Sequence, residues 1–182
     1  MNLRTKIGVV AVLLSTLTVQ AQNIPFRKAE IKETMKKVAD WQIANPNKGA
    51  EHGDLSWTNA VLYVGMLDWA ELAEREDGNK DYFKWLTRIG SRNGWQPDKR
   101  KYHADDIAVS QLFIDLYRKY KNKYMLNPTI ARTDWVMKNP PTDDFKLDYR
   151  KPETLERWTW CDALFMAPPV YTKLYVRTGD KK

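Results

Sequence analysis

Three short segments of the chain place aromatic side chains beside acidic or amide groups. They are GDLSWTNA at residues 53–60, KYHADDIAV at 101–109 and ERWTWCDALF at 156–165. Two carboxylates in differently tuned environments are the usual requirement for glycosidic chemistry, and the flat faces of tryptophan suit sugar rings. We therefore expect these segments to line one carbohydrate-binding cleft. The expected lining residues are Trp57, Asn59, Tyr102, His103, Asp105, Asp106, Trp158, Trp160 and Asp162.

Asp162 is the leading candidate for a general acid. It stands in WTWCDALFMAPP, residues 158–169, between two tryptophans and a run of apolar residues. Apolar surroundings disfavour the charged form of a carboxylate, which suits a proton donor, whereas a helix N-terminus favours the charged form. The second acid of the pair is Asp105 or Asp106, which are neighbours in the segment 101–109.

Each of these residues also has a structural explanation. Asp105, Asp106 and Asn59 stand where a helix is expected to begin, and such residues are most often N-caps. A single tryptophan is most often a core residue. The coincidence of aromatic and polar groups in three separate segments, rather than any one residue, favours a binding cleft.

Metal and thiol chemistry are disfavoured. His52 and His103 are the only histidines in the sequence, too few for a credible metal site. Cys161 is the only cysteine, so it has no partner for an intramolecular disulfide. The sequence identifies no base that would make its thiol a nucleophile. We expect neither a metal nor another cofactor.

Helical periodicity dominates the chain and predicts an all-α fold. Ile31, Met35, Val38 and Ala39 share one face of the first helix. The second, fourth and sixth helices are more apolar than their partners, which is typical of stacked αα-hairpins in an open solenoid or a closed toroid. In either arrangement the loops before the apolar helices lie at the same rim. The helices are expected at 28–43, 58–75, 81–89 with Asp81 as cap, from about 105, 128–138 and 162–177.

The first 21 residues have the pattern of a secretory signal peptide, with Arg4 and Lys6 before an apolar stretch and a small-x-small cleavage site. We expect residues 22–182 to form one domain of a soluble protein exported to the periplasm, with no membrane contact beyond the cleaved signal. The formal net charge is +7. Basic residues are interspersed with acidic ones and form no stripe, which argues against nucleic-acid binding.

The motifs SWTNA, HADDIAV and WTWCDALFMAPP, in this order on alternate helices, resemble glycoside hydrolase family 105, the unsaturated rhamnogalacturonyl hydrolases. The unsaturated glucuronyl hydrolases of family 88 share the pattern more distantly. The resemblance implies an (α/α)6 barrel, a toroid of six αα-hairpins with the active site at one end. It also implies hydration of the 4,5-double bond in the terminal unsaturated uronic acid of a pectin-derived oligosaccharide, without a cofactor.

By this resemblance, Asp162 matches the proton donor and general base, and Asp106 matches the other active-site aspartate. Trp160 and Asn59 match positions that contact the substrate. Further neighbours of the sugar are expected to be Asp105, His103 and Trp57.

Six helices supply three of the six hairpins, so the chain resembles the N-terminal half of such an enzyme. Alone, that half is expected to be inactive, or unstable because the edges of its inner helices face water. Two other functions fit the residues. One is an inverting toroidal glycosidase that uses Asp106 and Asp162, and the other is a helical protein that binds glycans or a partner without turnover.

Overall fold

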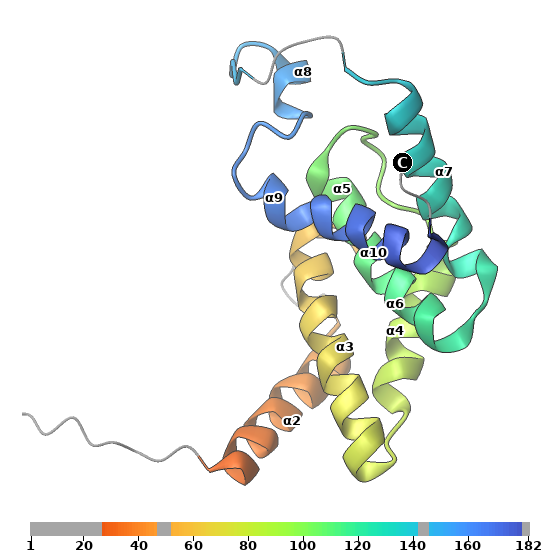
Figure 1. Ribbon diagram of the computed structural model, residues 1–182. Coiled ribbons are helices and arrows are strands. Elements are labelled where there is room, and N and C mark those ends of the chain that lie inside the picture. The colour runs from red at the N-terminus through yellow and green to blue at the C-terminus, as the bar shows by residue number, and fades with distance from the viewer. Residues whose placement is uncertain (1–26, 47–51, 142–145, 180–182) are drawn as a thin grey trace, which may run out of the picture. The chain divides into compact units, whose positions relative to one another are not determined.

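The computed structural model describes residues 27–46, 52–141 and 146–179, and within these ranges the chain is helical and has no strand (Figure 1). The predicted signal peptide lies outside the described residues. The helices are α2 (Lys28–Ala44), α3 (Trp57–Asp77), α4 (Asp81–Arg92), α5 (Ala104–Ala108), α6 (Ser110–Tyr120), η1 (Lys123–Met125), α7 (Asn127–Lys138), α8 (Pro152–Leu155), α9 (Ala163–Met166) and α10 (Pro168–Thr178).

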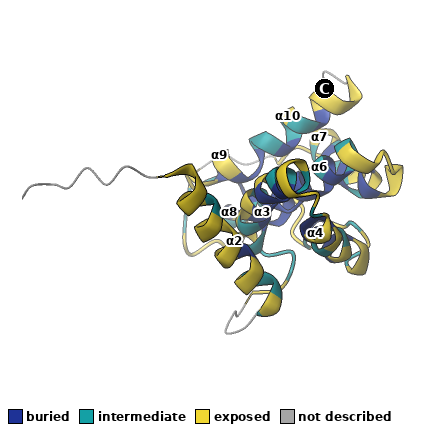
Figure 2. Cartoon of the chain, turned by 90° about the horizontal axis from the view of Figure 1, so that it is seen from below, coloured by how far each residue is buried: buried dark blue, intermediate teal, exposed yellow. Residues whose placement is uncertain are grey.

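The helices α3, α6 and α10 form the centre of the main unit, which comprises residues 35–182. Helix α6 contacts both α3 and α10, and α4 packs against α3 and α6 (Figure 1). The buried residues are most frequent on α3, α4 and α6 (Figure 2), and Leu112, Phe113, Ile114 and Leu116 of α6 are almost inaccessible to solvent. The second, fourth and sixth helices are expected from the sequence to be the more apolar members of their pairs. This expectation fits α6, whereas α4 also buries large side chains and α10 buries only Val170 and Leu174.

Ion pairs join the three central helices along their sides. The Lys173 ammonium of α10 lies 2.5 Å from the Asp115 carboxylate of α6. Lys119 of α6 pairs with Glu74 of α3. These side chains are partly exposed, so each pair is expected to contribute at most about 1 kcal/mol. Apolar burial, rather than these pairs, holds the helices together.

The fourth and sixth predicted helices are each divided into two pieces. Val109 separates α5 from α6, and Ala167 separates α9 from α10, whose first residues are Pro168 and Pro169. Proline has no amide hydrogen to donate, so the helix expected at 162–177 is interrupted and restarts at Pro168. The short helices α5 and α9 contact each other, and α5 also contacts α3. The segments that lead into the three central helices therefore lie at one end, which confirms the expected common rim.

The ends of α4 differ from the prediction. Asp81 is the first residue of the helix rather than its cap, and the Asn79 side chain accepts the Asp81 backbone N–H at 2.9 Å. The helix also continues past Gly90 to Arg92. The Trp95 ring packs so closely on Gly90 that a Cβ there would lie 2.2 Å from it. Gly90 is thus needed for side-chain packing, not for ending the helix.

The apolar face predicted for α2 is only partly correct. Ala39 is buried, but Met35 and Val38 are 40% and 60% exposed, and Ile31 is exposed too. Helix α2 is held to α4 by the Tyr82 hydroxyl, which donates to the Asp40 carboxylate at 2.6 Å. Among the described residues, no element covers most of this face.

Candidate active site

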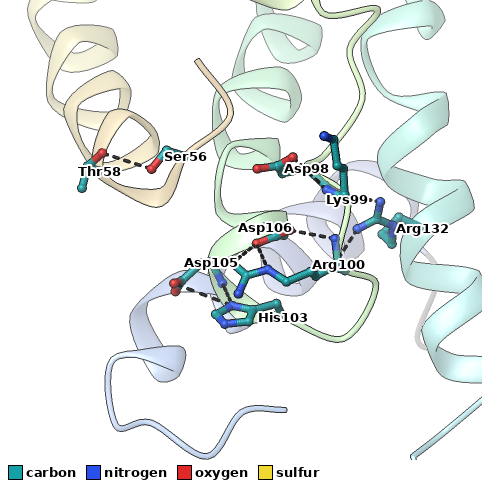
Figure 3. Close-up of polar contacts among 9 residues, drawn as sticks. All are labelled: Ser56, Thr58, Asp98, Lys99, Arg100, His103, Asp105, Asp106 and Arg132. Carbon is teal, nitrogen blue, oxygen red and sulfur yellow. Dashed lines mark hydrogen bonds and ion pairs between the residues drawn. The ribbon is translucent and has the colours of Figure 1, made fainter. Parts of the chain in front are cut away.

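The loop before α5, residues 98–103 (the α5 loop), is built around Asp106. This side chain is 3% exposed. One carboxylate oxygen accepts the Arg100 backbone N–H at 2.7 Å, and the other accepts the Arg100 guanidinium at 2.5 and 3.0 Å (Figure 3). Both oxygens of Asp106, one of the two candidates for the second acid, therefore accept hydrogen bonds from the α5 loop.

Arg132 of α7 fixes the same loop from the other side. Its guanidinium donates to the carbonyl oxygens of Asp98 at 2.7 Å and of Arg100 at 3.2 Å (Figure 3). The Asp98 backbone N–H in turn donates to the Asp106 carbonyl at 2.8 Å. A single guanidinium thus binds two backbone carbonyls of the α5 loop, which helps to fix its path.

Asp105 and His103 lie at the exposed side of the same turn. His103 is the N-cap of α5, and its Nδ1 accepts the Asp105 backbone N–H at 3.2 Å. Because Nδ1 accepts, the neutral ring carries its proton on Nε2. The Asp105 carboxylate lies 3.7 Å from Nδ1 and is 21% exposed. The capping explanation therefore holds for His103, whereas the Asp105 carboxylate remains accessible.

The charge of Asp162 acts on Asp105. Burial raises the pKa of Asp105, and the negative charge of Asp162 raises it further, while His103 and Arg100 act in the opposite direction. Asp105 lies on α5 and Asp162 directly precedes α9, and these two short helices contact each other. The structure thus brings Asp162 together with Asp105, and it turns Asp106 toward Arg100.

Asp162 precedes α9 and is exposed. Its side chain makes no capping hydrogen bond, so the N-cap explanation does not apply. Leu164 and Phe165 are 73% and 50% exposed, so the expected apolar enclosure of Asp162 is not found among the described residues. The reason is local: α9 has only four residues, and it turns Ala163 and Met166 inward while the two residues between them point outward.

The aromatic and amide residues of the three segments are also accessible. Trp57 and Trp160 are 43% and 45% exposed, so they are not core residues. Trp160 meets the edge of Tyr149 at a ring distance of 6.0 Å. Asn59 donates from its amide to the Gly53 carbonyl at 2.8 Å, and this bond ties the loop before α3 to the first turn of that helix.

Sequence reasoning missed Arg100 and Arg132. Arg100 stands only six residues before Asp106, but nothing in a loop sequence indicates which carboxylate a cation will reach. Arg132 reaches the α5 loop from a different helix. In the ranges that the structure describes, no cluster of three metal-binding side chains occurs and no helix is long and apolar enough to cross a membrane.

Comparisons with known proteins agree with this architecture. The model of Glycosyl Hydrolase Family 88 matches residues 28–182. An unsaturated 3S-rhamnoglycuronyl hydrolase of Formosa agariphila is 31% identical over 158 residues, which is 85% of this chain and 40% of that protein. A protein of the same description from an Alteromonas species is 25% identical and is covered to 41%. The chain thus spans about two fifths of the length of these curated relatives.

Solved structures match over a similar share. A polysaccharide lyase superimposes with a TM-score of 0.64 at 23% identity, over 84% of this chain and 42% of that one. A glycosyl hydrolase family 88 protein from Bacteroides vulgatus superimposes with a TM-score of 0.51 at 25% identity, over 82% and 43%. The all-α prediction is confirmed, and the three hairpins are part of an α/α toroid.

Proposed function

Because the chain belongs to glycosyl hydrolase family 88, we propose that the whole protein hydrolyses oligosaccharides whose non-reducing end is a 4,5-unsaturated uronic acid. Both curated relatives are described as hydrolases of unsaturated rhamnoglycuronyl compounds. The observation that carries the proposal is the placement of Asp105 on α5 and of Asp162 directly before α9, because these two short helices contact each other and the charge of Asp162 acts on Asp105. The predicted export to the periplasm would place such an enzyme where these oligosaccharides arrive.

The reaction needs one group that donates and accepts a proton. In the proposed mechanism the Asp162 carboxyl protonates C4 of the double bond, and positive charge develops at C5 and the ring oxygen. Water then adds at C5 and returns a proton to the Asp162 carboxylate. The resulting hemiketal opens and releases the neighbouring sugar. The exposure of Asp162 and the absence of a capping bond from its side chain support this role.

Asp105 is the better supported second carboxylate. Burial raises the pKa of Asp105, which favours the neutral, protonated form more than in a free carboxyl, and that form can donate a hydrogen bond to the substrate. Asp106 has both oxygens bound to Arg100. The same contacts weaken the alternative of an inverting glycosidase that pairs Asp106 with Asp162.

Two substrate classes fit the proposed function. The sequence motifs favour pectin-derived rhamnogalacturonan fragments, whereas both relatives are described by a 3S-rhamnoglycuronyl substrate. A hollow of about 670 Å³ near the loop before α9 supports an anionic substrate. It is lined by Lys146, Arg150, Lys151 and Arg157 together with Asp148 and Glu153, among other residues.

The decisive experiment follows the absorbance of the 4,5-double bond. The purified whole protein is mixed with lyase-generated disaccharides of either class. Hydration of the double bond removes its absorbance. Asp162→Asn should abolish this loss, while Asp68→Asn, an exposed carboxylate on α3, serves as the matched control. Binding of the disaccharide without any loss of absorbance by the wild type would instead support the non-catalytic, glycan-binding alternative.

A further inference from the structure

Tyr149 stands at the tip of a tight turn that precedes α8. The Lys151 backbone N–H donates to the Asp148 carbonyl at 2.8 Å, so Tyr149 and Arg150 occupy the two central positions of the turn. The Asp148 carboxylate also accepts the Arg150 backbone N–H at 3.0 Å and the Arg150 guanidinium at 3.0 and 3.1 Å. Tyr149, by contrast, is 68% exposed. The turn is therefore fixed by its own hydrogen bonds, and it presents an accessible aromatic ring.

Thr154 connects this turn with the segment that carries Trp160. The buried Thr154 hydroxyl accepts the Asp148 backbone N–H at 3.0 Å and donates to the Asp148 carbonyl at 2.8 Å. The Thr159 hydroxyl donates to the Thr154 carbonyl at 2.9 Å, and Thr159 directly precedes Trp160. One buried threonine therefore holds the two segments together.

The rings of Tyr149 and Trp160, called the aromatic corner below, pack against each other. Their centroids are 6.0 Å apart and their planes meet at 75°, which is a preferred geometry of aromatic pairs. Both residues are nevertheless exposed, so the aromatic corner leaves ring surface open to solvent. An exposed tryptophan without a neighbour would exchange between rotamers, and the Tyr149 ring favours one of them.

The turn that follows the aromatic corner carries the proposed proton donor. The Trp160 carbonyl accepts the Ala163 backbone N–H at 3.1 Å, so Trp160 is the first and Asp162 the third residue of one turn. The Asp162 carbonyl accepts the Phe165 backbone N–H of α9 at 2.8 Å. Hydrogen bonds thus fix the backbone at Trp160 relative to Asp162, and the orientation of the indole is the remaining variable.

We propose that Tyr149 is a positioning residue of the proposed active site. It holds the Trp160 indole in the orientation in which a sugar ring of the oligosaccharide packs on it while the unsaturated uronate reaches Asp162. This inference rests on the proposed function, and it assigns a role to a residue that acts through Trp160 rather than on the reacting atoms.

The expected effect is on binding and not on the chemical step. Packing of the C–H face of a sugar on an indole removes apolar surface from water. An indole that is already ordered loses little rotamer entropy when the sugar binds, whereas a mobile one loses more. Removal of the Tyr149 ring should therefore raise KM and leave kcat nearly unchanged.

The first test compares two substitutions of Tyr149 in the whole protein. Rates of double-bond loss with lyase-generated disaccharides give KM and kcat. We expect Tyr149→Ala to raise KM about threefold to tenfold, the range that such an aromatic pair supports, with kcat within about twofold of the wild type. Tyr149→Phe keeps the ring and should restore the wild-type KM. An unchanged KM in Tyr149→Ala, a loss confined to kcat, or a phenylalanine variant as impaired as the alanine variant would overturn the proposal.

Tyr124→Ala is the matched control. Tyr124 is likewise an exposed tyrosine, but it lies on η1. We expect unchanged KM and kcat in this variant. The urea midpoint of unfolding should be unchanged in both alanine variants, because both side chains are exposed. An equal rise of KM in the two variants would contradict a specific role of Tyr149.

A double-mutant cycle tests whether Tyr149 acts through Trp160. In a Trp160→Ala background, Tyr149→Ala should raise KM by less than about twofold, because the indole that it orients is absent. Additive effects would show that Tyr149 acts independently of Trp160 and would overturn the proposal. Isothermal titration of the disaccharide into the Asp162→Asn protein, with and without Tyr149→Ala, measures the effect on binding without turnover.

The positioning role and the proposed function can fail separately. If the wild type leaves the double-bond absorbance unchanged, but Tyr149→Ala weakens disaccharide binding to the Asp162→Asn protein, the proposed function fails and the role of Tyr149 in binding stands. If turnover occurs and the cycle is additive, the role of Tyr149 fails and the proposed function stands.

Discussion

Helix α5 and the segment before α9 each carry an aspartate, and the two aspartates differ in burial and in hydrogen bonding. Asp106 of α5 is buried, and each of its oxygens accepts a hydrogen bond from Arg100. Asp162 before α9 is exposed, and its side chain does not cap the helix. The α5 loop is also bound to α7 through Arg132. One segment therefore uses its acid to fix a backbone, and the other leaves its acid accessible.

The difference shows what separates a structural carboxylate from a reactive one. A buried carboxylate whose two oxygens accept hydrogen bonds from a cation and from an amide N–H holds those groups in place. Asp105, next in the chain to Asp106, lacks such a clamp and lies near the charge of Asp162. Of the two adjacent aspartates, Asp106 therefore supports the backbone, and Asp105 is the one that we propose for the chemistry.

The strongest test of this comparison is Asp162→Asn. The amide keeps the shape of the side chain but neither donates the proton to C4 nor accepts one from water. We expect turnover to fall by about 10²- to 10⁴-fold, while disaccharide binding is retained. The measurement is the rate of double-bond loss in the whole protein. Turnover within a few-fold of the wild type would move the proton donor elsewhere.

Asp106→Ala tests the structural side of the comparison. It leaves the Arg100 amide and guanidinium without their acceptor, and we expect the free energy of unfolding to fall by about 2 to 3 kcal/mol. Urea unfolding followed by circular dichroism measures this change. Asp162→Ala, the matched control, should change stability by less than about 0.5 kcal/mol because Asp162 is exposed. Equal losses of unfolding free energy in the two variants would show that Asp106 and Asp162 do not differ in their structural role.

The sequence predicted the helices and their common rim because both depend on periodicity and on chain order. The apolar spacing of α3 and α6 specifies which faces are buried, and Pro168 specifies where α10 begins. These features depend on neighbours within one turn of helix, so they can be read without knowledge of the tertiary structure.

The division between Asp105 and Asp106 could not be predicted in the same way. It depends on the path of the α5 loop, which lets Arg100 reach one carboxylate and not the other. Arg132 sets that path from α7, more than thirty residues along the chain. For the same reason the apolar pattern of α2 predicts a buried face, whereas Met35 and Val38 on that face are exposed.

Arg132→Lys separates geometry from charge at the α5 loop. Lysine keeps the positive charge, but its ammonium cannot bind the Asp98 and Arg100 carbonyls with a planar fork. We expect the free energy of unfolding to fall by about 1 to 2 kcal/mol. Arg132→Gln should lose a similar amount, since it lacks the same fork. Full stability in the lysine variant alone would show that charge, not geometry, holds the loop.

Asp105→Asn is expected to have the smallest effect. At neutral pH it should raise the free energy of unfolding, whereas the two preceding stability variants lower it. The folded state raises the pKa of Asp105 above its usual value of 3.8, through burial and then the charge of Asp162. Between 3.8 and the raised value the folded state binds more protons than the unfolded state, so this group lowers stability as pH rises. The variant should therefore be more stable than the wild type at pH about 7, with the difference vanishing below the unfolded pKa. Urea unfolding from below pH 3.8 to about pH 7 measures the difference in stability between the variant and the wild type. A stability gain that is equal at every pH would show that the carboxylate charge is not its cause.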